Sequence, residues 1–116
     1  MKKDYFYTLV KMSSGKAVFR KVSGYLIKLG IFSCGIYLGY RTVEGQPRKT
    51  WFIIELTSGI ALARGDTKKE TLEYGRRKVK TIPSADILRV IEKHIDEYGQ
   101  SPLYQEGFGL SEEKAI

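Results

Sequence analysis

The chain has one cysteine and one histidine among its 116 residues. A lone cysteine, Cys34, excludes an internal disulfide and a zinc site built from several thiolates. The single imidazole, His94, excludes most metal-ligand sets and every catalytic arrangement that needs a second histidine. We therefore predict a protein with no bound metal and no cofactor.

Long apolar runs are also missing. The most apolar stretch, residues 24–40, has about 17 residues and contains Lys28, whereas a membrane-spanning helix needs about 20 apolar residues. The N-terminal segment MKKDYFYTLV is too polar for a secretory signal and lacks a small-residue cleavage site. We expect a cytoplasmic protein with no membrane partner.

A strand, a turn and a second strand are predicted in the middle of the chain. Residues 51–54 are aromatic or β-branched, and Glu55 is the one charge in residues 51–56, which favours a strand. Thr57-Ser58-Gly59 follows, and residues 60–63 are again apolar. A three-residue loop that ends in glycine is typical of a hairpin closed by a type I turn and a G1 bulge, with Gly59 at positive φ.

A helix is predicted directly after this hairpin. Thr67 and Glu70 have the spacing of a capping box, so the helix should begin there. On a helical wheel Leu72, Gly75, Val79 and Ile82 share one arc. Gly75 lowers helix propensity by about 1 kcal/mol, which is sensible only where the helix backbone lies close to the sheet.

The N-terminal half predicts further strands at residues 5–12, 16–22 and 32–40. Gly35 and Gly39 share one face of the third of these strands and allow strong curvature or close packing there. Residues 25–29 fit either a short strand or a turn of helix. Residues 41–49 are expected to be a polar connector that makes a hairpin back into Trp51. VKMSSGKAVFR at residues 10–20 aligns with IELTSGIALAR at residues 54–64, either through duplication or through shared turn chemistry.

A second helix is expected from an N-cap at Ser84 to Gly99, with a broad apolar arc and His94 at the edge of the core. Residues 100–116, including Tyr104 and Phe108, have no periodicity and are expected to form a mobile tail. The predicted architecture is a single α+β domain over residues 1–99. It has a curved, mainly antiparallel sheet of about five strands, with two C-terminal helices packed on one face.

Charge is unevenly distributed along the chain. The net charge is +7, and residues 84–116 hold three basic and seven acidic residues, which leaves 17 basic and six acidic residues before them. This asymmetry is typical either of a face for a polyanion or of an ordinary solvated surface. We predict a binding surface made of eight cations: Lys68, Lys69, Arg76, Arg77, Lys80, Arg64, Arg41 and Arg48. Three of them, Lys69, Arg76 and Lys80, form a stripe along one side of the first helix. Glu73 is placed to pair with Arg77.

No residue set indicates catalysis. The glycines at 30, 35 and 39 do not match a phosphate-binding loop, and the glutamates are too scattered to supply an acid and a base. We predict a non-enzymatic basic protein, a nucleic-acid-binding accessory module for duplex DNA or RNA. The alternative is a protein-interaction or inhibitory module whose basic face meets an acidic protein.

One segment also resembles known sequences. The pattern of Trp51, Ile53, Glu55, Ser58, Gly59, Gly65, Thr67, Lys68, Lys69 and Glu70 is similar to a hairpin-helix segment in small uncharacterised proteins of Gram-positive bacteria and their mobile elements. The resemblance covers about 20 residues, largely those that hairpin and cap chemistry requires. It implies a mobile-element type of protein and no particular activity.

Overall fold

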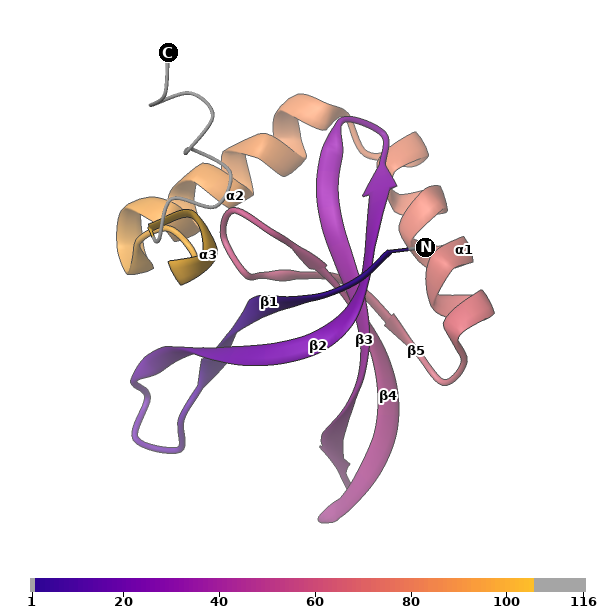
Figure 1. Ribbon diagram of the computed structural model, residues 1–116, viewed down its shortest axis with the longest axis vertical. Coiled ribbons are helices and arrows are strands. Elements are labelled where there is room, and N and C mark those ends of the chain that lie inside the picture. The colour runs from indigo at the N-terminus through magenta and orange to yellow at the C-terminus, as the bar shows by residue number, and fades with distance from the viewer. Residues whose placement is uncertain (1, 106–116) are drawn as a thin grey trace.

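Each strand of the sheet pairs antiparallel with the next strand in the chain, which gives an open sheet in the order β1-β2-β3-β4-β5. The computed structural model describes residues 2–105 (Figure 1). The predicted α+β fold with five antiparallel strands and C-terminal helices is confirmed. The strands are β1 (Lys2–Lys11), β2 (Ala17–Leu29), β3 (Phe32–Val43), β4 (Gln46–Glu55) and β5 (Ala61–Gly65). The helices are α1 (Lys68–Thr81), α2 (Ser84–Tyr98) and the short α3 (Pro102–Gln105).

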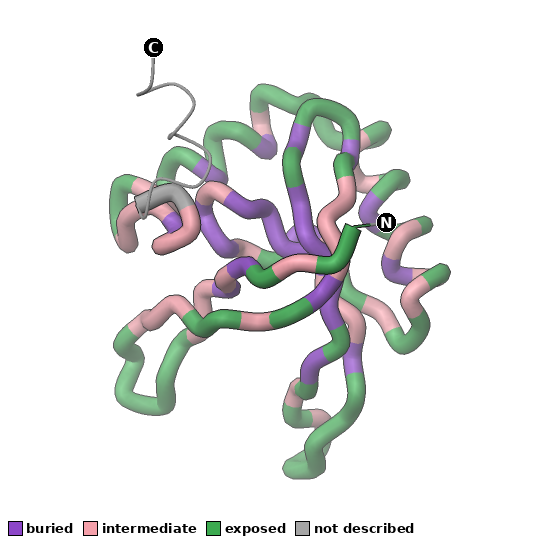
Figure 2. Tube along the Cα trace, viewed as in Figure 1, coloured by how far each residue is buried: buried purple, intermediate pink, exposed green. Residues whose placement is uncertain are grey.

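Apolar side chains on one face of the sheet form the larger core cluster. Cys34, Ile36 and Ile53 are fully buried there and pack with Ile87 and Ile91 of α2. Leu72 and Val79 of α1 cover the same cluster. Burying each large aliphatic side chain contributes about 1.5–3 kcal/mol, so this face holds the helices on the sheet. Figure 2 shows the buried residues gathered where the strands cross.

The opposite face carries a second cluster, formed because β1 curls back over the sheet. Phe6 is fully buried against Tyr37, with an edge-to-face ring separation of 6.0 Å. A Cβ at Gly35 would lie 2.5 Å from the Phe6 ring, so only glycine fits beneath that ring. The expected close packing at Gly35 is thereby confirmed, and it places buried residues on both faces of β3.

Helix α1 has the predicted start and the predicted close approach to the sheet. The Thr67 hydroxyl accepts a hydrogen bond from the Glu70 N–H at 3.1 Å, and Glu70 in turn accepts one from the Asp66 N–H at 3.1 Å. A Cβ at Gly75 would lie 2.8 Å from side-chain carbons of Ile53 and Leu29. Gly75 therefore lets the helix pack directly on β2 and β4.

The β4–β5 loop differs from the predicted three-residue turn. Gly59 has φ of 76° as expected, but its N–H donates to the Glu55 carbonyl at 2.8 Å and closes a four-residue loop. The cause is the Glu55 carboxylate, which is 3% exposed and accepts hydrogen bonds from the N–H and hydroxyl groups of both Thr57 and Ser58. The register shift lies between Ile53 and Ile54, away from the predicted G1 bulge at the loop.

Two segments of the N-terminal half are more extended than predicted. Residues 25–29, left open between strand and helix, form the end of β2 and turn through Gly30 (φ 58°) and Ile31 into β3. The polar connector at residues 41–49 forms the expected hairpin back to Trp51, but most of it is paired strand on both sides of a two-residue turn. Glu44 and Gly45 have φ values of 52° and 78°, the left-handed pair that a tight hairpin requires.

Strands β2 and β3 pair only near their shared turn, from Leu29–Phe32 to Tyr25–Ile36. Gly24 crosses β3 so closely that a Cβ there would lie 2.1 Å from the Ile36 carbonyl oxygen. Beyond this point the β1–β2 hairpin and the β3–β4 hairpin leave the centre in different directions (Figure 1). We call the space between residues 17–24 of β2 and residues 37–43 of β3 the fork.

The C-terminal part corrects one predicted boundary and extends the packed body. Pro83, not Ser84, occupies the N-cap of α2, because the Pro83 carbonyl already accepts from the Asp86 N–H at 2.9 Å. Gly99 ends α2 with φ of 86°, as predicted. Ser101 is fully buried and donates its N–H to the Thr57 carbonyl at 2.9 Å, and Leu103 packs against the Phe6 cluster.

The packed body therefore continues past residue 99 into α3. The rest of the expected tail, residues 106–116 with Phe108, lies outside the described residues, as does the side chain of Tyr104. Within residues 2–105, no helix has both the length and the apolar character needed to cross a bilayer.

Candidate functional site

The eight predicted cations separate into two groups on opposite faces of the sheet. Lys68, Lys69, Arg76, Arg77 and Lys80 belong to α1 on the helix-covered face. Ala63 packs against the helix-side core, so the next residue, Arg64, points to the other face. Arg41 shares that other face with Tyr37 and pairs with Arg48. A single surface made of all eight is excluded by this alternation.

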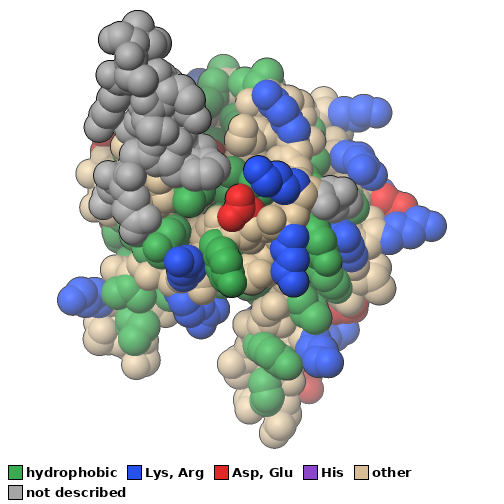
Figure 3. All heavy atoms as spheres, in the orientation of Figure 1, with side chains coloured by type: hydrophobic (Ala, Val, Ile, Leu, Met, Phe, Trp, Pro, Cys, Tyr) green, Lys and Arg blue, Asp and Glu red, His purple; other side chains and the backbone are tan. Residues whose placement is uncertain are grey.

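A groove between α1 and the β2–β3 turn brings three cations together. It has a volume of about 400 Å³ and is lined by Lys28, Leu29, Gly30, Arg76, Val79 and Lys80. Three of the six lining residues are cations, and none is acidic. We call this site the basic groove. Lys and Arg side chains are prominent along the side of the molecule occupied by α1 (Figure 3).

Lys28 is the one groove residue with a charge that sequence reasoning missed. It lies two residues before Gly30, whose positive φ lets β2 turn into β3 beside α1. An added Cβ at Gly30 would lie 3.9 Å from Val79, which shows how closely this turn meets the helix. Recognising Gly30-Ile31 as a two-residue hairpin turn would have placed Lys28 beside that turn, but its position next to Arg76 and Lys80 depends on where α1 packs.

Two α1 cations outside the groove lining, Lys68 and Arg77, lie over aromatic rings. The Lys68 ammonium lies 4.1 Å from the centre of the Tyr25 ring, and the Arg77 guanidinium lies 5.9 Å from that of Tyr74. The expected Glu73–Arg77 ion pair does not form, since the ion pairs among residues 2–105 join only Arg48 to Asp66 and Arg89 to Asp86. Lys69, Arg76 and Lys80 are in neither ion pair, so the charges of these three side chains are available to a ligand.

The arginines on the far face are held differently. Arg48 donates to Asp66 at 2.7 Å, so part of its charge is neutralised within the fold. The Arg41 Nε atom is buried and has no hydrogen-bond partner among the described residues. This face offers less free positive charge than the basic groove.

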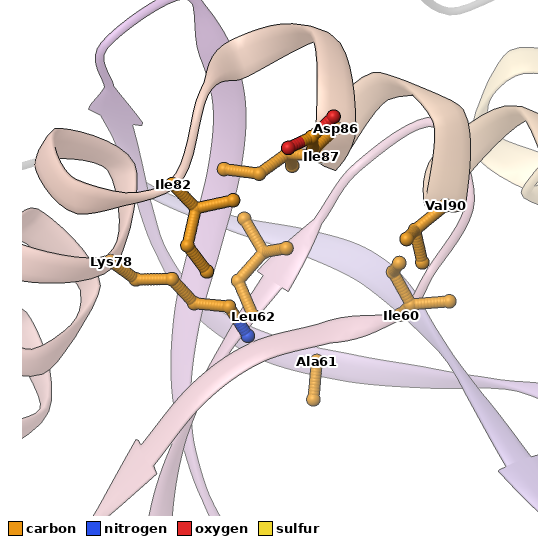
Figure 4. Close-up of a pocket in the computed structure, with 8 residues that line it drawn as sticks. All are labelled: Ile60, Ala61, Leu62, Lys78, Ile82, Asp86, Ile87 and Val90. Atoms are coloured by element: carbon orange, nitrogen blue, oxygen red, sulfur yellow. The ribbon is translucent and has the colours of Figure 1, made fainter.

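An apolar pocket of about 290 Å³ lies beside the edge strand β5, where α1 meets α2. Ile60, Leu62, Ile82 and Val90 line it, with Lys78 reaching in from α1 (Figure 4). The Asp86 carboxylate points away from these apolar side chains (Figure 4). Lys78 and Asp86 are the polar residues of the lining, and its apolar residues suit an apolar contact.

Cys34 and His94 occupy structural positions. Burial and, secondarily, the neighbouring Glu55 carboxylate raise the pKa of the Cys34 thiol from 9.0 to about 12, so the thiol stays protonated. His94 is half-buried, with Nδ1 3.0 Å from the Val90 carbonyl and its ring beside Tyr98. Among residues 2–105, no group of three or more potential ligands is arranged to hold a metal ion.

The raised pKa of Cys34 predicts a pH-dependent loss of stability. Above pH 9 the thiol ionises in the unfolded chain while the native thiol keeps its proton, so stability falls as pH rises towards about 12. Between about pH 8 and about pH 10 this group should lower the free energy of unfolding by about 1.4 kcal/mol. Urea melts at both pH values should show a larger loss for the wild type than for Cys34→Ala. Equal losses would contradict the assigned pKa.

Comparison of the chain with protein families, curated proteins and solved structures found no match. The geometry of the chain itself therefore carries the functional argument.

Proposed function

We propose that this protein is a non-enzymatic module that binds duplex nucleic acid through the basic groove and the adjoining stripe on α1. The observation that supports this most is the meeting of Lys28, Arg76 and Lys80 around one concave site with no carboxylate in its lining. Lys69 extends the positive surface along α1, seven residues before Arg76. We also propose that the protein acts in the cytoplasm and belongs with the small mobile-element proteins that residues 51–70 resemble.

The expected mode of binding is electrostatic. Counterions condense along the phosphates of nucleic acid. When lysine or arginine side chains replace them, the released counterions gain entropy, and this stabilises the complex. Lysine contributes a point charge, and arginine adds a planar donor fork that suits phosphate oxygens. Arg76 is the one lining residue with the guanidinium fork that can read guanine, and no asparagine or glutamine is in the lining, so we expect little dependence on sequence.

Removing the charges of the stripe should change the salt dependence of binding. We expect Lys69→Gln, Arg76→Gln and Lys80→Gln together to reduce the slope of log K against log salt by about two to three units, because each neutralised phosphate contributes about 0.9. Fluorescence anisotropy with a labelled duplex of about 12 base pairs, slightly more than one helical turn, measures this slope. All three side chains are exposed, so the thermal melt should not change.

A matched control removes the same charge elsewhere. Lys3, Lys11 and Lys16 are exposed on the β1–β2 hairpin, and their joint replacement by glutamine should leave the slope within about one unit of the wild type. Equal slopes for the stripe variant and the wild type would remove the stripe from the binding surface. Failure of the wild type to bind any duplex at low salt would overturn the proposed function.

A protein-interaction module is the second candidate. The observation that favours it is the fork, where two strands of the sheet diverge and their facing edges have no partner strand among residues 2–105. An acidic partner suits the basic composition of both arms.

A further inference from the structure

The fork presents two strand edges that the sheet leaves unpaired. β1 pairs with β2 along the whole hairpin, and β3 pairs with β4 from Cys34 to Val43, but β2 and β3 separate beyond Tyr25 and Ile36. Within the described part of the chain, seven residues of β3, from Tyr37 to Val43, therefore have a partner strand on one side only. An unpaired edge of this length is a template for another strand.

The direction of the backbone groups follows from the hydrogen bonds on either side. The Ser33 carbonyl accepts from the Leu56 N–H on the β4 side at 3.0 Å. Because N–H and C=O groups alternate sides along a strand, the backbone groups of even-numbered β3 residues face β2 and the fork. The position of the Ile36 carbonyl beside Gly24 agrees with this alternation. Leu38, Tyr40 and Thr42 consequently direct their N–H and C=O groups into the fork.

The backbone groups of β2 alternate between β1 and the fork in the same way. The Lys16 carbonyl accepts from the Met12 N–H at 2.7 Å, so the even-numbered residues of β2 direct their backbone groups to β1. The odd-numbered residues Phe19, Lys21 and Ser23 direct theirs into the fork. A groove of about 320 Å³ lies between the two edges. Consecutive residues of both strands line it, Tyr37 to Tyr40 on β3 and Val22 to Ser23 on β2, as expected for strand edges rather than one sheet face. Figure 3 shows the open space between the two arms.

The charge around the fork identifies the chemistry of an occupant. Residues 5–43 contain six lysines and arginines and no aspartate or glutamate. Arg20 and Lys21 lie on one side of the fork and Arg41 on the other. A second copy of this chain would bring like charges together at such an edge, whereas an acidic segment would be attracted.

We propose that the fork receives an extended acidic segment of another protein, which adds to the edge of β3 as a sixth strand. The alternating N–H and C=O groups of Leu38, Tyr40 and Thr42 form the ladder, and cationic side chains on both arms meet the acidic side chains. Nucleic acid fits this site less well, because phosphates only accept hydrogen bonds and would leave the strand carbonyls unpaired. The proposal develops the second candidate function and does not depend on the basic groove.

The probe is a fluorescein-labelled heptapeptide, Thr-Glu-Val-Glu-Val-Glu-Thr, titrated with the full chain and followed by anisotropy at low salt. We expect saturable binding. Tyr40→Pro removes a fork-facing N–H without touching the β4 ladder and should weaken binding by about tenfold or more. Tyr40→Ala keeps that N–H and should bind within about threefold of the wild type.

Three further measurements change the peptide backbone, reverse one charge beside the groove, and compare binding of duplex. Methylating alternate peptide nitrogens on the probe should abolish binding without any change to the protein, so the proposal stays testable even if Tyr40→Pro fails to fold. Arg20→Glu should weaken binding, because it reverses one charge beside the groove. Duplex binding at the basic groove should be unchanged in every fork variant, which separates this proposal from the proposed function.

Several outcomes would overturn the proposal. These are no binding of the heptapeptide at millimolar concentration, equal affinity of the methylated and unmethylated probes, and equal affinity of a folded Tyr40→Pro variant and wild type. Tighter binding of a labelled oligothymidylate than of the peptide, lost equally in Tyr40→Pro and Tyr40→Ala, would assign the fork to single-stranded nucleic acid instead.

Discussion

Replacing Gly24 by alanine is expected to lower the free energy of unfolding by about 3 kcal/mol or more. The new Cβ would lie 2.1 Å from the Ile36 carbonyl oxygen and 2.9 Å from the Tyr37 Cβ. The Ile36 oxygen is a backbone atom at the centre of β3, and the Tyr37 Cβ is bonded directly to the backbone there. Neither atom can move without displacing the strand. The backbone at Gly24 does not have positive φ, so the loss would come from the contact alone.

Gly45→Ala is the matched control for that change. Gly45 has φ of 78° and open space around it, so alanine there should lower stability by about 1–2 kcal/mol through backbone strain without a clash. Urea melts of both variants measure the difference. If Gly24→Ala is no more destabilised than Gly45→Ala, β2 does not cross β3 as closely as described, and the fork has a different shape.

Glu55→Ala should be the most damaging change in the β4–β5 loop, at about 3 kcal/mol. The buried carboxylate accepts bonds of 2.8 Å from the Thr57 N–H and 2.9 Å from the Ser58 N–H, besides both hydroxyls. Removing it leaves two backbone donors without acceptors in a closed site. The same loop holds β1 and α3, through Gly59 to Leu9 and Thr57 to Ser101, so its loss should loosen both.

Glu55→Gln provides the graded comparison, because an amide keeps one acceptor oxygen and leaves only one backbone N–H without a partner. We expect its stability to lie between those of the wild type and Glu55→Ala in denaturant melts. A Glu55→Ala protein within about 0.5 kcal/mol of the wild type would contradict the role of the carboxylate.

Features set by neighbouring residues were predictable from the sequence. The capping pair of Thr67 and Glu70, the left-handed Gly59 and the terminal Gly99 all follow from local backbone chemistry. Gly75 was also predictable, since glycine on the inner arc of a helix implies a close contact. Each of these predictions needed only a few consecutive residues or one helical wheel.

Features set by contacts across the fold were not predictable in the same way. The four-residue β4–β5 loop is an exception, because its cause is local: the Glu55 carboxylate accepts bonds from Thr57 and Ser58 in a sequence that fits a three-residue turn equally well. The apolar Gly30-Ile31 turn resembles the middle of a strand, and this hid both the β2–β3 hairpin and the place of Lys28. The division of the eight cations between two faces depends on strand register, which composition and charge do not reveal.

The most direct test of the proposed function is a ¹H–¹⁵N spectrum of the labelled full chain titrated with a duplex of about 12 base pairs. We predict that the largest amide shifts fall on residues 28–30 and 76–80, around the basic groove, and that they vanish at high salt. Shifts confined to the two hairpin arms, or no shifts at low salt, would contradict the proposal that the basic groove binds phosphates.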